Sequence, residues 1–353
     1  MVVTQKKIAA DLGISLMTVY RCLSGKGYVG ARTRKRINDY IRRHNYRLNL
    51  TARSLKLKKT NTVGLVVPAF SYSYYPEIIE SIRRTLGGKY NLLLSLSDDS
   101  DETEHAALEM LMSIPVDGIL LSPTGSPASL ETCREMRAQG IPFVLFDRYF
   151  PQIADYPAVS TDCADSSAEL ITHLASLGHR KIAHIGGNPY DSFAALMLKG
   201  YKAGLKRNGL PFDKRLVKQG PLTEQFGNEA MKQLLDSGIP FTAVHAANDP
   251  AAIGVMAACR ERGISIPQDI SVTGFSDISV SRHLDPPLTT VREQTAEIGS
   301  IAAELLIRQI EKTAENANRI ILLPGQFVER ASVAPAPCAT THLAPRPRLP
   351  RKA

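Results

Sequence analysis

Residues 4–25 read TQKKIAADLGISLMTVYRCLSG, and this stretch decides how the N-terminal part of the chain folds. Thr4 can cap a helix that Gly13 ends, and Ser15 can cap a second helix that Gly25 ends. Apolar residues recur at helical spacing in both segments. The stretch therefore predicts two short helices joined by a tight Gly-Ile-Ser turn.

A third helix is predicted over residues 31–44, where apolar side chains share one face. Three short helices with a tight turn between the first two describe a helix-turn-helix unit, whose second helix enters the major groove of DNA. Leu16, Met17 and Arg21 would then meet the base edges. The Arg21 guanidinium can hold guanine O6 and N7, whereas Leu16 and Met17 offer apolar contact, for example to a thymine methyl group.

Positive charge is concentrated in the first sixty residues. Residues 1–60 hold 15 Lys and Arg against two Asp and Glu, a net charge of +13, whereas the 353-residue chain carries +9. Residues 61–353 therefore sum to −4. A basic head on a mildly acidic body indicates two functions in one chain, one of them directed at phosphate. A small helical bundle with a solvated basic face is the alternative reading of this charge.

From Thr62 onward, short apolar runs alternate with amphipathic helical stretches. This alternation predicts parallel sheets with helices on both faces, and the number of units predicts two Rossmann-like lobes rather than one open sheet. The expected fold is an all-α helix-turn-helix headpiece followed by an α/β two-lobed body. The apolar runs are TVGLVV (62–67), NLLLSL (91–96), DGILLS (117–122), PFVLF (142–146), KIAHIG (181–186), TAVHAA (242–247) and ISVTGF (270–275).

Ligands of such folds bind beyond the carboxyl ends of the strands, here in the cleft between the lobes. Tyrosine rings in this position can stack on a sugar, although packing at the edge of a lobe is an alternative role. Helix capping is the alternative for Asn248 and Asp249, which precede Pro250. The effector-binding candidates that follow predicted strands are Tyr74, Tyr75, Ser122, Asp147, Arg148, Phe193, Asn248, Asp249 and Ser276.

The string IAADLGISLMTVYRCLSG and its spacing to ARTRKRI and HNYRLNLTARSL resemble the headpiece of the lactose-repressor (LacI/GalR) family. The resemblance implies that Leu16, Met17 and Arg21 read bases. Tyr20 stands where the family usually has Ser, Gly30 where it has a capping Ser, and Leu48 where it has Pro. The residues implied to contact DNA phosphate are Thr4, Ser15, Thr18, Tyr20 and Ser24.

Residues 49–60 resemble the hinge of this family. Asn49 can cap a segment too short to form a stable helix alone in water. The resemblance implies a hinge helix that orders on operator DNA beside its dimer partner, in the minor groove. Leu55 would wedge into a central base step, Ala52 would face the partner helix, and Arg53 would lie near the phosphates or the groove floor. A charged linker is the alternative.

The body resembles the same family, since GHRKIAHIGG, AANDPAAIG, PQDISVTGFSD and PPLTTVREQ occur in the family's order. The resemblance implies a periplasmic-binding-protein-like body. Met197 stands where the family has a pocket Arg, and Ser276 where an acid often binds sugar hydroxyls. The expected boundaries are 1–48 for the headpiece, 49–60 for the hinge, 61–332 for the body (lobe one 62–160 and 291–318, lobe two 161–290 and 319–332) and 333–353 for a disordered Pro- and Arg-rich tail.

Several classes of protein are disfavoured by the sequence. No run approaches the ~18 apolar residues of a membrane helix, and no signal peptide is recognisable, which favours the cytoplasm. The five cysteines are scattered without CxxC spacing, so free thiols are expected. No nucleophile, metal or phosphate-loop pattern indicates an enzyme, a metal or a cofactor.

The sequence therefore predicts a nucleoid-associated, sequence-specific transcriptional regulator, in particular a repressor. It would bind a palindromic double-stranded DNA operator as a homodimer. A small-molecule effector, such as a carbohydrate, would occupy the interlobe cleft. A dimer is expected because the C-terminal residues contain no heptad for a tetramer. The alternatives are a cytoplasmic solute receptor and a nucleoid protein with little sequence preference.

The hinge resemblance gives a first prediction. Leu55→Ala should keep the fold and lose much of the operator affinity, because the wedge that opens the base step is removed. Gel-shift titrations at fixed salt measure this loss, with melting temperature as the control for folding. Unchanged specific binding would contradict the assigned role of Leu55.

Overall fold

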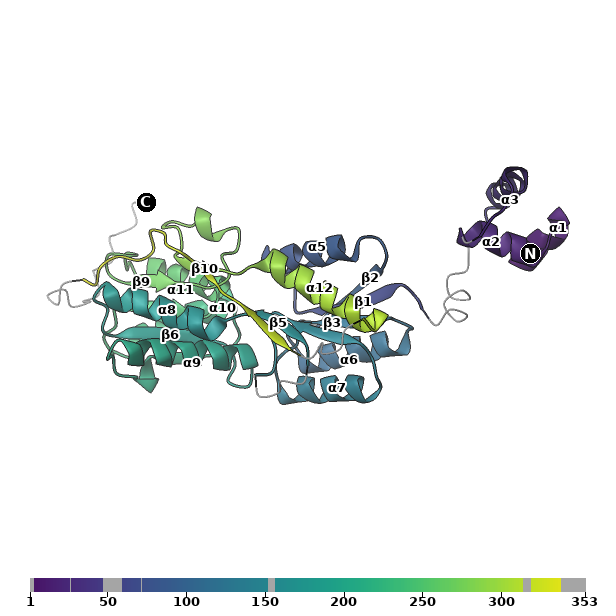
Figure 1. Cartoon of the computed structure of the whole chain (residues 1–353). Coiled ribbons are helices and arrows are strands. Elements are labelled where there is room, and N and C mark those ends of the chain that lie inside the picture. The colour runs from purple at the N-terminus through teal and green to yellow at the C-terminus, as the bar shows by residue number, and fades with distance from the viewer. Residues whose placement is uncertain are drawn as a thin grey trace. The chain divides into compact units, whose positions relative to one another are not determined.

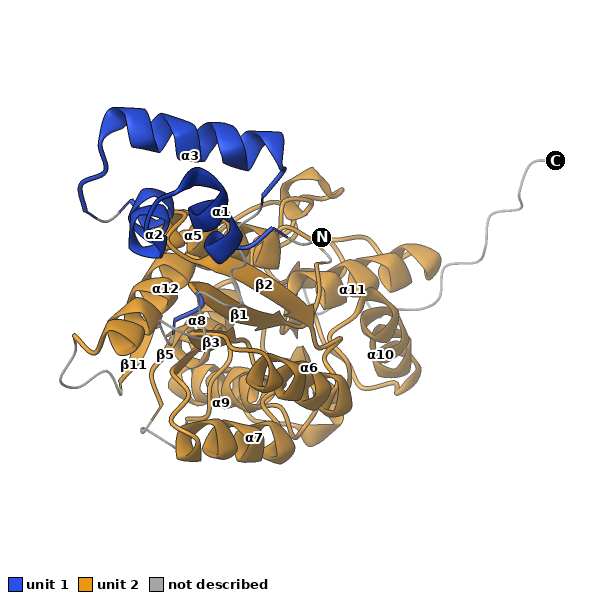
Figure 2. Ribbon diagram, turned by 90° about the vertical axis from the view of Figure 1, so that its right-hand side faces the viewer, with its two compact units in different colours: residues 1–60 blue, residues 61–353 orange. Residues whose placement is uncertain are grey.

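The computed structural model divides into two compact units, residues 1–60 and 61–353 (Figure 2). The hinge candidates Asn49, Ala52, Arg53 and Leu55 lie outside the described part of the chain. The residues that the structure describes are 3–25, 27–46, 59–70, 72–151, 156–313 and 319–337.

The described residues of the headpiece form three helices, as the sequence predicts: α1 (Gln5–Leu12), α2 (Leu16–Ser24) and α3 (Ala31–Arg43). The Thr4 hydroxyl accepts the hydrogen bond of an amide at the start of α1, and Gly13 ends this helix with a φ of 63°. This left-handed conformation costs glycine little, because it has no Cβ atom. The local sequence thus sets both ends of the turn between α1 and α2.

A small apolar core holds the three helices together. Ile8 of α1, Val19 of α2 and Ile37 of α3 have no exposed surface. Burial of an aliphatic side chain of this size stabilises the fold by about 2 kcal/mol relative to an exposed one. Polar contacts between α1 and α3 add to this core: Arg36 donates to the Leu12 carbonyl at 2.9 Å, and the Tyr40 hydroxyl donates to the Asp11 carboxylate.

The first lobe of the body is built on a six-stranded parallel sheet with the order β11-β5-β4-β3-β1-β2. Two helices, α5 (Tyr74–Leu86) and α12 (Thr295–Glu311), pack on one face, and α6 (Asp101–Ser113) and α7 (Pro127–Ala138) pack on the other (Figure 1). The strands are β1 (Thr62–Val67), β2 (Asn91–Leu96), β3 (Gly118–Leu121), β4 (Phe143–Phe146), β5 (Ala158–Thr161) and β11 (Ile320–Leu323).

The second lobe has a four-stranded parallel sheet with the order β7-β6-β8-β9. Apolar side chains of α8 and α9 pack on one face, and those of α10 and α11 pack on the other. The elements are α8 (Cys163–Ser176), β6 (Ile182–Gly186), α9 (Ser192–Arg207), β7 (Val217–Gln219), α10 (Glu224–Asp236), β8 (Ala243–Ala246), α11 (Asp249–Glu261) and β9 (Ser271–Thr273). The expected α/β two-lobed body is confirmed.

The C-terminal part of the body differs from the expected boundaries in two ways. Residues 319–332 are not all in the second lobe, because β11 pairs with β5 at the edge of the first sheet. The chain then forms β12 (Gln326–Val328), which pairs antiparallel with β10 (Thr290–Arg292). The expected boundary of a disordered tail at residue 333 is also wrong. The amide of Ala336 donates to the Leu177 carbonyl at 2.8 Å.

Asp277 ties this C-terminal segment to the second lobe. Its side chain has no exposed surface and lies between two arginines, Arg330 at 2.6 Å and Arg292 at 2.7 Å. A buried carboxylate paired in this way leaves uncompensated charge when one partner is removed.

Within the described residues, no helix is long and apolar enough to cross a membrane.

This cluster gives a prediction about stability. Asp277→Ala should lower the free energy of unfolding by about 3 kcal/mol, because Arg330 loses its buried counter-charge. Asp236→Ala is the matched control, since the pair with Arg262 at 2.8 Å lies on the surface and should contribute less than about 1 kcal/mol. Urea titrations of both variants measure the difference, and equal losses would contradict the structural role of Asp277.

Candidate functional site

The three base-reading candidates lie together on α2. Leu16 and Met17 are 42% and 56% exposed, which is unusual for apolar side chains of this size in a small domain. Arg21 is also exposed and follows Met17 by one helical turn, so both residues share a face. The aliphatic part of the Arg21 side chain passes close to Gly27. A Cβ atom added to this glycine would lie 3.4 Å from the Arg21 Cδ atom. This face of α2 is therefore open to a partner.

The phosphate-contact candidates surround this face. Thr4 and Ser15 are exposed at the N-termini of α1 and α2, where amide groups favour anions. The Ser15 hydroxyl accepts from the Thr18 amide at 3.1 Å and lies 2.8 Å from the Thr18 hydroxyl. Tyr20 and Ser24 are half-buried on α2. The structure thus places all five on or next to the helices of the turn.

The body contains a cavity of about 620 Å³ where the strand ends of its two lobes meet. Such a volume suits a small organic ligand. The first lobe contributes the loops after β1, β2 and β4, and the second lobe contributes those near α9, α10 and α11. The lining residues are Pro68, Ala69, Tyr72, Tyr74, Tyr75, Asp98, Asp99, Asp147, Arg148, Phe193, Leu222, Thr223, Glu224, Gln225, Asn248, Pro250, Ser276, Ile278 and Glu293.

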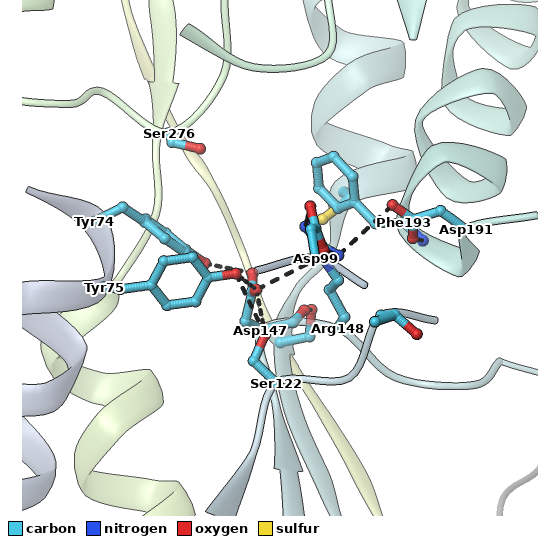
Figure 3. Close-up of polar contacts among 12 residues, drawn as sticks. Tyr74, Tyr75, Asp99, Ser122, Asp147, Arg148, Asp191, Phe193 and Ser276 are labelled. Atoms are coloured by element: carbon cyan, nitrogen blue, oxygen red, sulfur yellow. Dashed lines mark hydrogen bonds and ion pairs between the residues drawn. The ribbon is translucent and has the colours of Figure 1, made fainter. Parts of the chain in front are cut away.

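Asp147, directly after β4, organises the floor of the cavity (Figure 3). Its carboxylate accepts hydrogen bonds from Tyr74 at 2.7 Å, from Tyr75 at 2.6 Å and from Ser122 at 2.9 Å. Burial and the charge of Asp147 raise the pKa of both tyrosines well above the usual value, so their hydroxyls remain donors. The Asp147 backbone has a φ of 65°, a left-handed conformation that non-glycine residues adopt mainly at constrained sites.

Arg148 lies on the other side of this carboxylate. Its guanidinium forms an ion pair with Asp99, approaches Asp191 within 3.9 Å, and lies 4.0 Å from Asp147. Only 11% of its side chain is exposed. Arg148 comes from the first lobe and Asp191 from the second, so the arginine bridges the cleft and its charge is largely compensated by the protein.

Glu293 is a buried carboxylate in the same wall. It accepts from the Ser276 hydroxyl at 2.9 Å and lies 3.2 Å from the Tyr74 hydroxyl. Burial and the nearby charge of Asp147 raise the pKa of Glu293 to about 7. Two neighbouring buried carboxylates disfavour double ionisation, so Glu293 is partly protonated near neutral pH. This perturbation within a cavity is typical of a binding site.

Three effector-binding candidates do not line the cavity. Met197 has no exposed surface and belongs to the apolar core beside α8. Asp249 is also fully buried, and its carboxylate is occupied by the Ile278 amide and by the hydroxyls of Ser281 and Thr290. Ser122 is fully buried and donates a hydrogen bond to the Asp147 carboxylate, which itself lines the cavity.

The other candidates lie in the cavity wall. Asn248 lines it, and its side chain both caps α11 and donates to the Leu222 carbonyl at 3.0 Å. Asn248 therefore caps α11, as the alternative interpretation expects, and also lines the cavity. Ser276, with a φ of 105°, reaches Glu293. The remaining candidates in the wall are Tyr74, Tyr75, Asp147, Arg148 and Phe193.

Glu293 is the main residue that the sequence analysis missed. It follows β10, so the same strand-end rule would have indicated it, as it would Asp99 after β2. Glu224 gives no such signal: it opens α10 and accepts a hydrogen bond from Tyr72 of the opposite lobe. A basic helix-turn-helix unit joined to a two-lobed body with a cavity defines the class of DNA-binding regulators.

Comparisons with known proteins agree with this class. The model of the lacI family of bacterial regulatory proteins matches residues 4–49, and that of the periplasmic binding protein-like domain matches residues 171–333. Catabolite control protein A of Priestia megaterium is 31% identical over 334 residues, which cover 94% of this chain and 99% of that protein. The ribose operon repressor of Escherichia coli strain K12 is 31% identical over 332 residues, 93% of this chain and 99% of the repressor.

Solved structures give the same result. The lac repressor dimer bound to operator and the anti-inducer ONPF matches with a TM-score of 0.82 and 25% identity, over 95% of this chain and 100% of that one. The complex of the regulator CelR with cellobiose matches with a TM-score of 0.71 and 27% identity, over 94% of this chain and 99% of that one. The chain therefore belongs to the LacI family of bacterial regulatory proteins, and it is a DNA-binding regulator of transcription.

The raised pKa of Glu293 gives a prediction about pH. Between pH 4.5 and about 7 the folded protein keeps a proton that the unfolded chain has released, so the free energy of unfolding falls as pH rises through this window. Glu293→Gln cannot ionise. Between pH 5 and pH 8, the free energy of unfolding of the unmodified protein should therefore fall by on the order of 3 kcal/mol more than that of the variant. Melting temperatures at pH 5 to 8 measure this, and parallel curves would contradict it.

Proposed function

We propose that this protein represses transcription by binding a palindromic operator as a homodimer, and that a small molecule in the interlobe cavity controls the binding. The observation that carries the proposal is the open face of α2, where Leu16, Met17 and Arg21 are exposed on a basic headpiece. One such helix reads only a few base pairs, so two copies related by a two-fold axis are needed for a specific site.

The DNA contacts divide into two chemical groups. Leu16, Met17 and Arg21 would contact base edges, with Arg21 giving the strongest discrimination through its paired donors. The hydroxyl residues would contact phosphates and set the position of the headpiece without reading sequence. The proposed phosphate contacts are Thr4, Ser15, Thr18, Tyr20 and Ser24. Asn49, Ala52, Arg53 and Leu55 would bind the minor groove through the hinge.

The proposed effector contacts come from both lobes. Tyr74, Tyr75, Asp147 and Arg148 line the cavity from the first lobe, and Phe193 lines it from the second. A ligand that contacts both lobes binds one arrangement of the cleft better than another, which is the requirement for control by a ligand. The solved relatives support a ligand of sugar type, because one of them holds cellobiose and another, from Enterococcus faecium, holds ribose.

We infer that the chain binds rather than catalyses, and that it acts in the cytoplasm, associated with the nucleoid. Several of its relatives are named as transcriptional regulators or repressors, which supports this inference. The described residues contain no group of three or more His, Cys, Asp and Glu that could hold a metal ion. The cavity tyrosines and carboxylates fit ligand recognition, with hydroxyl donors and acceptors at its floor.

Arg21→Ala tests the proposal. The variant should lose about 1–3 kcal/mol of discrimination at one symmetric pair of operator positions, because the paired contact to guanine is lost. Operators selected from a random library by the unmodified protein supply the site, and binding to each base substitution measures the discrimination.

The matched control is Lys35→Ala, which removes the same charge from a different helix, α3. It should change affinity for all sequences alike and leave the base preference intact. Equal binding of the unmodified protein to every duplex would instead support a nucleoid protein with little sequence preference. A protein that remains monomeric at working concentrations would contradict the dimeric mode of binding.

A further inference from the structure

The loop after β1 is tied to the second lobe at two points. The Tyr72 hydroxyl donates a hydrogen bond to the carboxylate of Glu224, the first residue of α10. The Tyr72 backbone has a φ of 68°, a left-handed conformation that a tyrosine adopts mainly at constrained sites. The Ser73 hydroxyl, one residue further on, accepts a hydrogen bond from the Ser279 amide at 2.9 Å. Both contacts join protein groups directly and leave no space for a ligand atom between them.

An ion pair from the loop after β4 also crosses between the lobes (Figure 3). Arg148 is held in the first lobe by Asp99 and approaches Asp191 of the second lobe within 3.9 Å. Asp191 is fixed by its own lobe, because its carboxylate accepts the Phe193 amide at 2.8 Å and caps α9. Burial raises the pKa of Asp191 although the charge of Arg148 opposes this shift. Desolvation thus offsets much of the attraction, and this pair by itself adds little to closure.

The lobes also approach each other closely at Gly125, in the loop between β3 and α7. Its φ of 84° lies in the left-handed region that favours glycine. A Cβ atom added there would lie 2.8 Å from the Ser192 hydroxyl oxygen, and 2.9 Å from both Asp191 Oδ1 and the Ser192 amide nitrogen. Gly125 and Ser192 are both buried. A side chain at position 125 would therefore push the start of α9 away from the first lobe.

These contacts bear on an equilibrium between open and closed lobes. Chain crossings that follow β5 and β11 and precede α12 join the lobes, and crossings of this kind act as hinges in two-lobed proteins. A neutral hydrogen bond between the lobes changes such an equilibrium by about two- to tenfold. The combined contacts at Tyr72, Ser73 and Gly125 are therefore enough to make the closed form the main one.

We propose that the contacts of Tyr72, Ser73 and Gly125 with the second lobe form a clasp, by which the protein alone closes its body over the cavity. An effector then reaches the cavity only from the open form, so the clasp lowers the apparent affinity for the effector. The control of operator binding through this clasp rests on the proposed function, whereas the closing of the lobes does not.

The test measures the distance between the lobes in the full-length protein by pulsed electron paramagnetic resonance. Glu135→Cys on α7 and Lys199→Cys on α9 carry the spin labels, because both positions are exposed and both helices lie away from α12 (Figure 1). Cys22 and Cys338 are replaced by serine, and the other three native thiols are buried and should not react. An excess of a co-expressed copy without the introduced cysteines leaves one labelled protomer per dimer.

Gly125→Ala should shift the distances to longer values and lower the ratio of closed to open molecules by about tenfold or more, because the added Cβ atom overlaps the start of α9. Gly140→Ala is the matched control in the same lobe. Its φ of 69° imposes a similar backbone strain, and none of the described atoms lies within 4 Å of the added Cβ atom. It should leave the distances unchanged.

Tyr72→Phe tests the clasp at its other end and removes only a hydroxyl group. It should lower the ratio of closed to open molecules by about two- to tenfold, and folding should be unaffected because Tyr72 is 39% exposed. Tyr190→Phe is the control, since it makes the same change at a residue that is 79% exposed and is outside the cavity lining. Unchanged distances in a folded clasp variant would overturn the clasp. If Gly125→Ala fails to fold, Tyr72→Phe alone decides.

Gel shifts of the same variants separate the clasp from the proposed function. Longer distances together with unchanged operator affinity would keep the clasp and contradict the control of operator binding through the cavity. Unchanged distances together with specific operator binding by the unmodified protein would overturn the clasp and leave the proposed function standing. Longer distances together with altered operator affinity support both.

Discussion

The hydrogen-bonded carboxylate of Asp147 is the interaction on which the cavity depends. It joins the start of α5, the end of β3 and the end of β4, three segments that are distant in the sequence. Without these bonds, the buried carboxylate would lose three donors, and a buried polar group left unsatisfied costs about 1–3 kcal/mol. The position of the tyrosine rings, and therefore the shape of the cavity floor, follows from this one acceptor.

The body uses buried acids in two different ways. Asp277 and Asp249 lie away from the cavity, and donors or arginines satisfy their carboxylates. Glu293 lies in the cavity wall, where it accepts hydrogen bonds from the Ser276 and Tyr74 hydroxyls and has no counter-charge among the described residues. The first arrangement serves the stability of the second lobe. The second places a carboxyl group with a raised pKa in the cavity wall, which is typical of a binding site.

The local sequence predicts the headpiece almost completely, because Thr4, Ser15 and Gly13 determine where the helices begin and end. The strand-end rule also indicates Asp147 and Arg148 correctly as lining residues. It does not determine which way a side chain points, so Asp249 is buried instead of lining the cavity. Met197, which the family resemblance indicated, is buried as well.

Long-range pairing is the other part that the sequence does not show. Glu293 meets Tyr74 across 219 residues of sequence, and β11 pairs with β5 after an interval that contains the whole second lobe. The apolar pattern of a strand predicts that it is buried but does not name its neighbour in a sheet. The lobe assignment of residues 319–332 failed for this reason.

The late position of β11 and β12 has a consequence for synthesis on the ribosome. The headpiece is complete within the first sixty residues, so it can fold while the body is still being made. The first sheet must wait for α12 and β11, and the second lobe waits for the Ser332 carbonyl that accepts the Val272 amide. A nascent chain would thus display its DNA-facing helices well before it possesses a finished ligand chamber.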